Sequence, residues 1–146
     1  MFNHFTVSAR RAIFFARWEA GAEGAASIAG EHLLLGLLRE DPAIESAFPD
    51  AGAARRIRER IEAHSPRRES LPESVDMPVS IDCQQVFEAA TKEAKGLHQT
   101  DVSTEHLLLA LLHQEKGFAT QILLEQGFEL EKFRSQRAPL NPSDFE

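Results

Sequence analysis

Apolar residues recur three and four positions apart through most of this chain, the spacing that places them on one face of an α-helix. No stretch of useful length alternates apolar and polar residues with period two, so the pattern predicts no β-sheet. The first helix is expected to begin at Thr6 or Ser8, whose side chains can accept from free amides, and to end at Gly21 and Gly24. Its apolar positions are Ala9, Ala12, Ile13, Ala16 and Ala20, with Phe14, Phe15 and Trp18 on a second side. A helix this broadly apolar is predicted to pack against more than one neighbour.

One stretch of eight residues occurs twice. Residues 31–38 read Glu-His-Leu-Leu-Leu-Gly-Leu-Leu, and residues 105–112 repeat them with alanine in place of the glycine, 74 positions later. An unbroken match of this kind indicates a duplication. Each copy is predicted to form a helix with buried leucines. Glu31 or Glu105 then lies in the first turn, where a carboxylate stabilises the helix dipole.

The remainder of the first half predicts two short helices and a linker. An Asp-Pro pair at 41–42 ends the octet helix or begins the next one, since proline fits a first helical position. Helices are predicted over 43–48 and 53–63 from their apolar spacing. Residues 65–79 contain three prolines and are polar almost throughout, which predicts an extended linker.

The second half repeats this plan. Ser80 or Asp82 is predicted to cap a helix that runs to about residue 97, and Thr104 is predicted to be the N-cap of the second octet helix. Apolar spacing predicts two more helices, over 116–126 and 129–137. The last residues, 138–146, contain two prolines and are predicted to form a flexible tail.

Composition narrows the class of protein without identifying it. With 146 residues, 42% hydrophobic and 27% charged, the chain is typical of a globular domain. Its net charge of −7 disfavours non-specific binding to nucleic acid. The single cysteine excludes an internal disulfide. No apolar run reaches the length of about 18 residues typical of a membrane span, and no signal peptide is recognisable, so a cytoplasmic location without membrane partners is expected.

The duplicated octet and its surroundings resemble the Clp N-terminal domain, the double-repeat module at the front of the AAA+ unfoldases ClpA, ClpB and ClpC. The residues that carry the resemblance are Phe5, Thr6, Ala9 and the first octet, then Ser80, Ala90, Ala94, Thr104 and the second octet. The resemblance implies an all-α fold of about eight helices, in two four-helix Clp repeats related by a pseudo-twofold axis. It implies a double Clp N-type domain over 1–137, made of repeat one (2–64), the linker (65–79) and repeat two (80–137), before the tail.

The ATPase modules of those unfoldases have no counterpart in this sequence. No G-x-x-x-x-G-K-[ST] phosphate-binding loop is present, so no nucleotide cofactor is expected. The sequence leaves open whether the chain is a self-standing module or a part of a longer unfoldase.

Glu31 and Glu105 have two interpretations. In the first, each carboxylate only satisfies amides and the dipole at the start of its helix. The second comes from the resemblance to ClpC-type domains, in which the equivalent glutamates help bind arginine-phosphorylated substrates. A carboxylate pairs with a guanidinium through two parallel hydrogen bonds, and free amides near Thr6 and Ser80 would hold the phosphoryl group. The hypothetical phosphoarginine- or peptide-binding residues are therefore Thr6, Glu31, Ser80 and Glu105.

Other candidate chemistry points to structural roles. His32 and His106 lack the His pair of a zinc helix, so each is expected to be hydrogen-bonded within its own repeat and no metal site is predicted. Cys83 is expected to be a small packed residue. Four arginines between 55 and 60 are expected to form a solvated helix face, or alternatively a surface for an acidic partner. No catalytic constellation is assignable, so the chain is not expected to be an enzyme.

The leading functional interpretation is therefore a non-enzymatic module that binds substrate polypeptides or adaptor proteins of a Clp-type unfoldase or protease system. The alternative is a free-standing regulatory or structural accessory that docks on a Clp complex; a small hydrolase or a metalloprotein is a third, distant option. The seam between the repeats is expected to offer a groove for an exposed peptide. Candidate apolar residues at its edge are Phe2, Phe14, Phe15 and Phe118.

Overall fold

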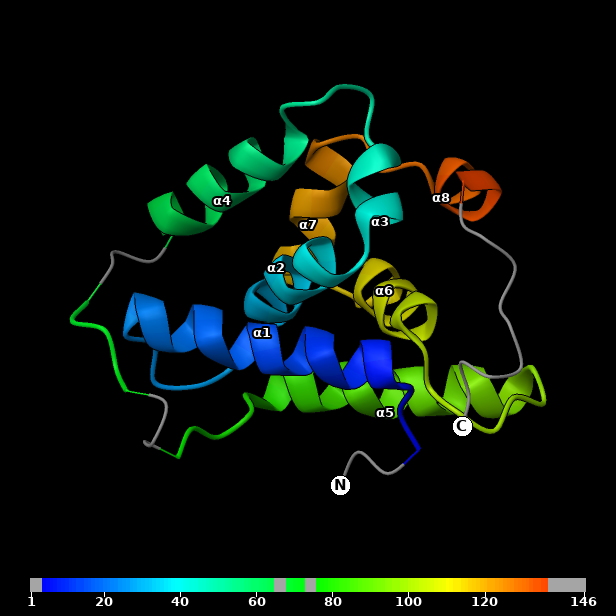
Figure 1. The fold of residues 1–146 in the computed structure, drawn as a ribbon, viewed down its shortest axis with the longest axis horizontal. Helices are drawn as coiled ribbons and strands as arrows, with labels where there is room; N and C mark the ends of the chain where they lie inside the picture. The colour runs from blue at the N-terminus through cyan, green and yellow to red at the C-terminus, as the bar shows by residue number, and fades with distance from the viewer. Residues whose placement is uncertain (1–3, 65–67, 73–75, 137–146) are drawn as a thin grey trace.

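The computed structural model describes residues 4–64, 68–72 and 76–136, and within these ranges the chain forms eight helices (Figure 1). The prediction of an all-α fold is confirmed, and the only β-type pairings in the described residues are two isolated bridges. In chain order the helices are α1 (Val7–Glu23), α2 (Gly30–Glu40), α3 (Pro42–Ser46), α4 (Ala53–His64), α5 (Ile81–Gly96), α6 (Thr104–His113), α7 (Phe118–Glu125) and α8 (Leu130–Gln136).

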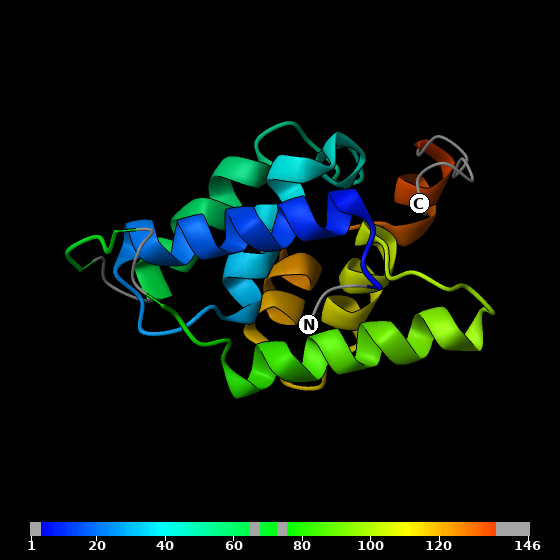
Figure 2. The ribbon, with the colours of Figure 1, turned by 60° about the horizontal axis from the view of Figure 1, so that its bottom comes forward.

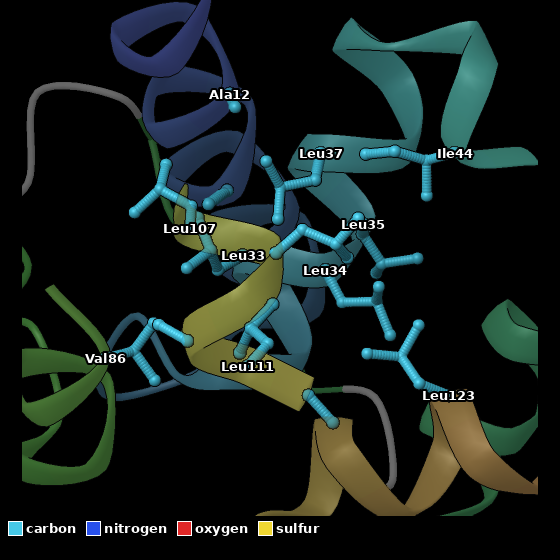
Figure 3. Packing of buried hydrophobic residues seen from close by; sticks show 14 of the residues in the cluster. Ala12, Leu33, Leu34, Leu35, Leu37, Ile44, Val86, Leu107, Leu111 and Leu123 are labelled. Carbon is cyan, nitrogen blue, oxygen red and sulfur yellow. The ribbon is translucent and has the colours of Figure 1, made fainter. Parts of the chain in front are cut away.

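The two octet helices, α2 and α6, lie at the centre of the molecule. Figure 2 shows the long helices α1 and α5 on opposite sides of α2, α6 and α7, while Figure 1 shows α4 and α8 towards opposite ends. The octet leucines fill the space between these layers (Figure 3). Those with no exposed surface are Leu33, Leu34 and Leu37 of α2, and Leu107, Leu108 and Leu111 of α6. Burial of this apolar surface is the main stabilising contribution to the fold.

A short backbone pairing joins the segment before α1 to the segment before α6. The amide of Thr6 donates to the carbonyl oxygen of Val102 at 2.9 Å, and the amide of Val102 donates to the carbonyl oxygen of His4 at 2.7 Å. The pair Phe5–Val102 is the resulting parallel bridge. The start of the first half is therefore fixed to the second half.

The reciprocal pairing joins the segment before α5 to the segment before α2. The amide of Ser80 donates to the carbonyl oxygen of Ile28 at 2.9 Å, and the amide of Ile28 donates to the carbonyl oxygen of Pro78 at 2.9 Å. The residues of the two bridges are equivalent in the repeat. Ser80 and Pro78 lie 74 positions after Thr6 and His4, and Ile28 lies 74 positions before Val102. The two halves thus correspond element by element and pair reciprocally, as expected for a pseudo-twofold arrangement.

The ends of α1 and α6 differ from the prediction. Gly24 is the C-cap of α1, with φ 75°, but Gly21 lies within the helix and does not end it. The prediction of Thr104 as an N-cap is wrong, because Ser103 caps α6 and Thr104 is its first residue. The remaining short helices differ from the predicted ranges by at most two residues at each end, where hydrogen bonding fades gradually.

The single difference between the octets corresponds to a difference in helix packing. A Cβ atom on Gly36 would lie 2.2 Å from the carbonyl oxygen of Ala12 and 2.9 Å from the amide nitrogen of Ala16, both in the backbone of α1. The octets otherwise match, and Ala110 occupies the same place in α6. The backbone of α1 therefore crosses α2 at a distance that only glycine permits.

Two expectations about surface side chains are met only in part. Phe14 and Trp18 lie on a second apolar side of α1, as expected, but neighbouring elements cover this side only partly, because the two residues are 58% and 43% exposed. The arginines of α4 do not simply form a solvated face. Arg58 donates two hydrogen bonds to the buried carboxylate of Glu19, at 2.9 and 2.7 Å, and so links α4 to α1.

Candidate functional site

The first candidate site, called the α1 site, combines the first turn of α1 with Glu105 of α6. The Thr6 hydroxyl accepts from the amide of Ala9 at 3.1 Å, so it caps its own helix. The next two amides, of Val7 and Ser8, belong to the first helical turn, which has no intrahelical acceptors for them. The bridge from Thr6 to Val102 brings this turn beside the segment that leads into Glu105.

The second candidate site, called the α5 site, is its counterpart and combines the first turn of α5 with Glu31 of α2. Ser80 accepts from the amide of Cys83 at 3.1 Å and caps α5. The bridge from Ser80 to Ile28 lies three residues before Glu31. The predicted residues are therefore brought together in crossed pairs at the backbone level: Thr6 with the segment before Glu105, and Ser80 with the segment before Glu31.

The two sites differ in their charges. Arg134 of α8 lies 3.7 Å from the carboxylate of Glu105, whose side chain is 23% exposed. The first turn of α5 contains Asp82, whereas the first turn of α1 contains no acid. A negative charge favours the same positive helix end that an anion would occupy. Sequence reasoning considered Asp82 only as a possible helix cap and assigned no partner to Arg134, because a contact between two helices leaves no local pattern.

The octet histidines have structural roles, as predicted. His32 Nδ1 accepts from the amide of Ala29 at 2.9 Å, and its Nε2 lies 2.9 Å from a carboxylate oxygen of Glu23. His106 Nδ1 accepts from the amide of Ser103 at 2.8 Å, and both histidines are buried. Each ring therefore accepts a hydrogen bond from the N-cap amide of its own helix. In the described part of the chain, no group of three or more His, Cys, Asp or Glu side chains could hold a metal ion.

Cys83 is fully buried in the first turn of α5, which confirms its packing role. Burial, followed by the negative charges of Glu31 and Asp82, raises the pKa of its thiol from 9.0 to about 12. The charge of Glu31 thus acts on the α5 site. Because the reactive form of cysteine is the thiolate, this thiol is held in its unreactive state.

We expect Cys83 to resist alkylation by iodoacetamide in the native protein at pH 8 and to react fully in denaturant. The thiol also makes stability depend on pH. Its pKa is raised in the folded state, so the stabilisation is complete below about pH 9 and is lost as the pH rises towards about 12. Mass spectrometry of alkylated protein measures the first effect. Rapid native labelling at pH 8 would contradict the buried position.

Two cavities adjoin these sites. One of about 430 Å³ is lined by Glu31 and His32 and by polar residues that sequence reasoning did not connect with this site: Glu23, His64 and Arg68. A larger groove of about 620 Å³ spans both halves, with Phe5, Val79 and Phe87 as its apolar lining. None of the three predicted edge residues that the structure describes lines this groove. Phe2 lies outside the described residues, Phe14 is on the outer surface of α1, and Phe118 stacks on His64 with ring centroids 3.9 Å apart.

Across the described ranges, no helix combines the length and the apolar character needed to cross a bilayer.

Comparison with known proteins identifies the double repeat. The family model described as "Clp repeat (R) N-terminal domain" matches residues 4–126. The Bacillus subtilis protein named negative regulator of genetic competence ClpC/MecB is 32% identical over 138 residues, which is 93% of this chain and 17% of that protein. Chloroplastic ClpD of Arabidopsis thaliana is 31% identical, over 87% of this chain and 15% of the relative. The chain thus spans less than a fifth of the length of these relatives.

Solved structures agree with this assignment. The N-terminal domain of ClpD from Arabidopsis thaliana superimposes with a TM-score of 0.74 and 30% identity, over 92% of this chain and 95% of that one. The Hsp104 N-terminal domain from Candida albicans has the same fold, with a TM-score of 0.73 and 23% identity over 92% and 89%. With its two matching octets, its crossed backbone bridges and a family match over most of its length, the chain belongs to the Clp repeat N-terminal domain family.

Proposed function

We propose that this chain is a non-enzymatic module that captures substrate polypeptides or an adaptor protein for a Clp-type unfoldase. The observation that carries the proposal is the crossed pairing of the two halves. It sets the amide-rich start of α1 beside the segment leading to Glu105, and the start of α5 beside the segment leading to Glu31. Each candidate site thus pairs donors for an anion with an acceptor for a cation. A ligand with both charges on one side chain fits this arrangement.

Phosphoarginine is the ligand that we infer for these two sites. Its phosphoryl group would accept from the free amides of the first helical turn, where the helix dipole favours a negative charge. Its guanidinium would donate to the carboxylate of Glu105 or Glu31 through two hydrogen bonds. The hydroxyls of Thr6 and Ser80 already cap their helices, so the neighbouring backbone amides are the phosphoryl donors.

Charge favours the α1 site over the α5 site. Asp82 would repel a phosphoryl group at the start of α5, and no acid opposes it at the start of α1. A ligand at the α1 site must displace Arg134 from Glu105, but this pair is partly exposed at 3.7 Å, and exposed ion pairs contribute only about 0–1 kcal/mol. Binding at the α1 site is therefore expected to be the stronger of the two.

The groove between the halves supports a role in holding the rest of the captured chain. Phe5 comes from the first half, Val79 from the end of the linker and Phe87 from the first helix of the second half. Apolar side chains next to an amide-rich helix start suit a polypeptide that presents a charged residue beside apolar ones.

Isothermal titration calorimetry with free phosphoarginine tests the two sites. Glu105→Ala is expected to weaken binding about ten- to a hundred-fold, because a charge-assisted hydrogen-bonded contact contributes about 1.5–3 kcal/mol. Glu31→Ala is expected to have a smaller effect. Glu45→Ala, at an exposed position on α3, is the matched control and should bind like the wild type. Arginine without its phosphoryl group should bind much more weakly.

Equal heats for the wild type and Glu105→Ala would contradict the assigned ligand. A separate pull-down distinguishes the wider functions. Retention of unfolded polypeptide without any ATPase supports substrate capture, whereas retention of Clp subunits alone supports the accessory role.

A further inference from the structure

An exposed cluster of rings and guanidinium groups lies on the outer side of α1 and includes none of the four candidate site residues. We call it the aromatic–arginine patch; it consists of Arg11, Phe14, Phe15, Trp18 and Arg39. The rings of Phe14 and Phe15 pack edge to face with centroids 5.9 Å apart. Phe14 and Trp18 are 58% and 43% exposed, so two large rings of one helix remain in contact with water. Neighbouring exposed rings of this kind mark interaction surfaces more often than isolated ones do.

The second half of the molecule shows that the fold does not require this patch. Helix α5 has the same place in its repeat as α1, and α6 the same place as α2. The corresponding residues are all exposed and include no large apolar side chain: Gln85, Glu88, Ala89, Lys92 and His113. Small or polar residues thus suffice at the same helix positions. The rings of the first half therefore need an explanation other than folding.

The charges of the patch are positive and only partly compensated. Arg11 pairs with Glu40 at 2.5 Å, and the side chain of Glu40 is only 8% exposed, so this carboxylate is already used. The Arg39 guanidinium lies over the rings of Phe15 and Trp18, at 4.5 and 5.1 Å from their centroids. None of the ion pairs found among the described residues includes Arg39. Stacking fixes the plane of the guanidinium and leaves its N–H edge available for a carboxylate.

We propose that the aromatic–arginine patch is a docking surface for an acidic segment of a partner protein that carries apolar side chains between its carboxylates. The rings would bury the apolar side chains, and Arg39 would pair with a carboxylate. Arginine and tryptophan are the residues that most often dominate binding energy at protein interfaces. Rings with arginines also suit single-stranded nucleic acid, but a phosphate backbone needs a row of cations, and this patch has only two guanidinium groups, one of them paired with Glu40. A protein segment is therefore the better match. The proposal uses neither Glu31 nor Glu105 and is independent of phosphoarginine binding.

The fluorescence of Trp18 tests this proposal directly, because the chain has one tryptophan and no tyrosine. The probe is a synthetic peptide in which aspartate and glutamate alternate with leucine and phenylalanine. Saturable binding with a blue shift of the Trp18 emission is expected. The same peptide with asparagine and glutamine in place of the acids should bind about ten-fold more weakly.

Two variants locate the contact. Arg39→Gln should weaken the affinity about ten-fold, as loss of a central interface arginine does, and Phe14→Ala should weaken it measurably. Arg55→Gln, on the exposed face of α4, is the matched control and should bind like the wild type. Circular dichroism confirms that each variant is folded.

Three results would overturn the proposal. The first is Trp18 emission that the acidic peptide does not change, or an affinity that stays the same when the neutral peptide replaces the acidic one or when the Arg39→Gln variant replaces the wild type. The second is tighter binding of an oligothymidine than of the acidic peptide. The third is a concentration-dependent dimer, detected by sedimentation, that shifts the Trp18 emission without any peptide.

Discussion

Replacing Gly36 by alanine is expected to lower the free energy of unfolding by about 3 kcal/mol, the upper part of the range for overpacked cores. The added Cβ would lie 2.2 Å from the carbonyl oxygen of Ala12 and 2.9 Å from the amide nitrogen of Ala16. Both are backbone atoms in the middle of α1, so no side chain can rotate away to make room. The helix α1 must instead shift as a whole, which disturbs its packing on α2. Thermal unfolding should show a midpoint lower by roughly 10 °C.

The duplicated sequence supplies the control for this experiment. Ala110 has the place of Gly36 in α6, and the change Ala110→Gly removes a methyl group from a buried helix position. That change should cost about 1 kcal/mol, from the flexibility of glycine and the lost burial. If Gly36→Ala were no more destabilising than Ala110→Gly, the close crossing of α1 over α2 would be refuted.

Replacing His106 by alanine is also expected to cost about 3 kcal/mol, as for other buried side chains with several hydrogen bonds. The ring is 1% exposed and accepts from the amide of Ser103, while its Nε2 is hydrogen-bonded to the side chain of Gln99. The variant would leave the Ser103 amide without this acceptor and would open a cavity at the start of α6. Urea unfolding measures the loss.

His113→Ala is the matched control, because His113 is an exposed histidine at the other end of the same helix. Its stability should stay within about 0.5 kcal/mol of the wild type, as for other surface substitutions. Equal stability of the His106 and His113 variants would show that the ring does not support the helix start.

The helices and their central leucines could be predicted because both depend on local spacing. Six apolar residues behind an acid and a histidine indicate a buried helix wherever they lie in the chain, and five of the six are buried in each octet. The position of a cap is harder to predict. Ser103 and Thr104 both carry hydroxyls, and only the backbone conformation at the helix start decides which of them caps it.

The errors of prediction have a common physical cause, since periodicity shows which residues share a face but not whether another element covers that face. Phe14 and Trp18 occupy helical positions suited to a core, and no neighbour covers them fully. Arginine is a residue type usually found at the surface, but Arg58 donates hydrogen bonds to the buried Glu19, which lies 39 positions earlier. Such long-range contacts depend on the assembled fold.

For the candidate sites, the sequence named four residues but not the way in which they combine. The resemblance pointed to Thr6, Glu31, Ser80 and Glu105, and local patterns assigned each to a helix start. The crossing between halves rests on four backbone hydrogen bonds, and backbone groups carry no sequence signal. The pairing of Arg134 with Glu105 likewise appears only when α8 is placed in space.

The crossed bridges have a consequence for the origin of the molecule. Each bridge joins a segment of the first half to a segment of the second half or of the linker directly before it. In a single copy of the repeat, the segments before its first and second helices would therefore lack these partners. Two identical chains, however, could satisfy each other around a true twofold axis with the same set of bonds. The single chain thus has the bonding pattern of a symmetric dimer, and because its two halves are not identical, each can present a different surface.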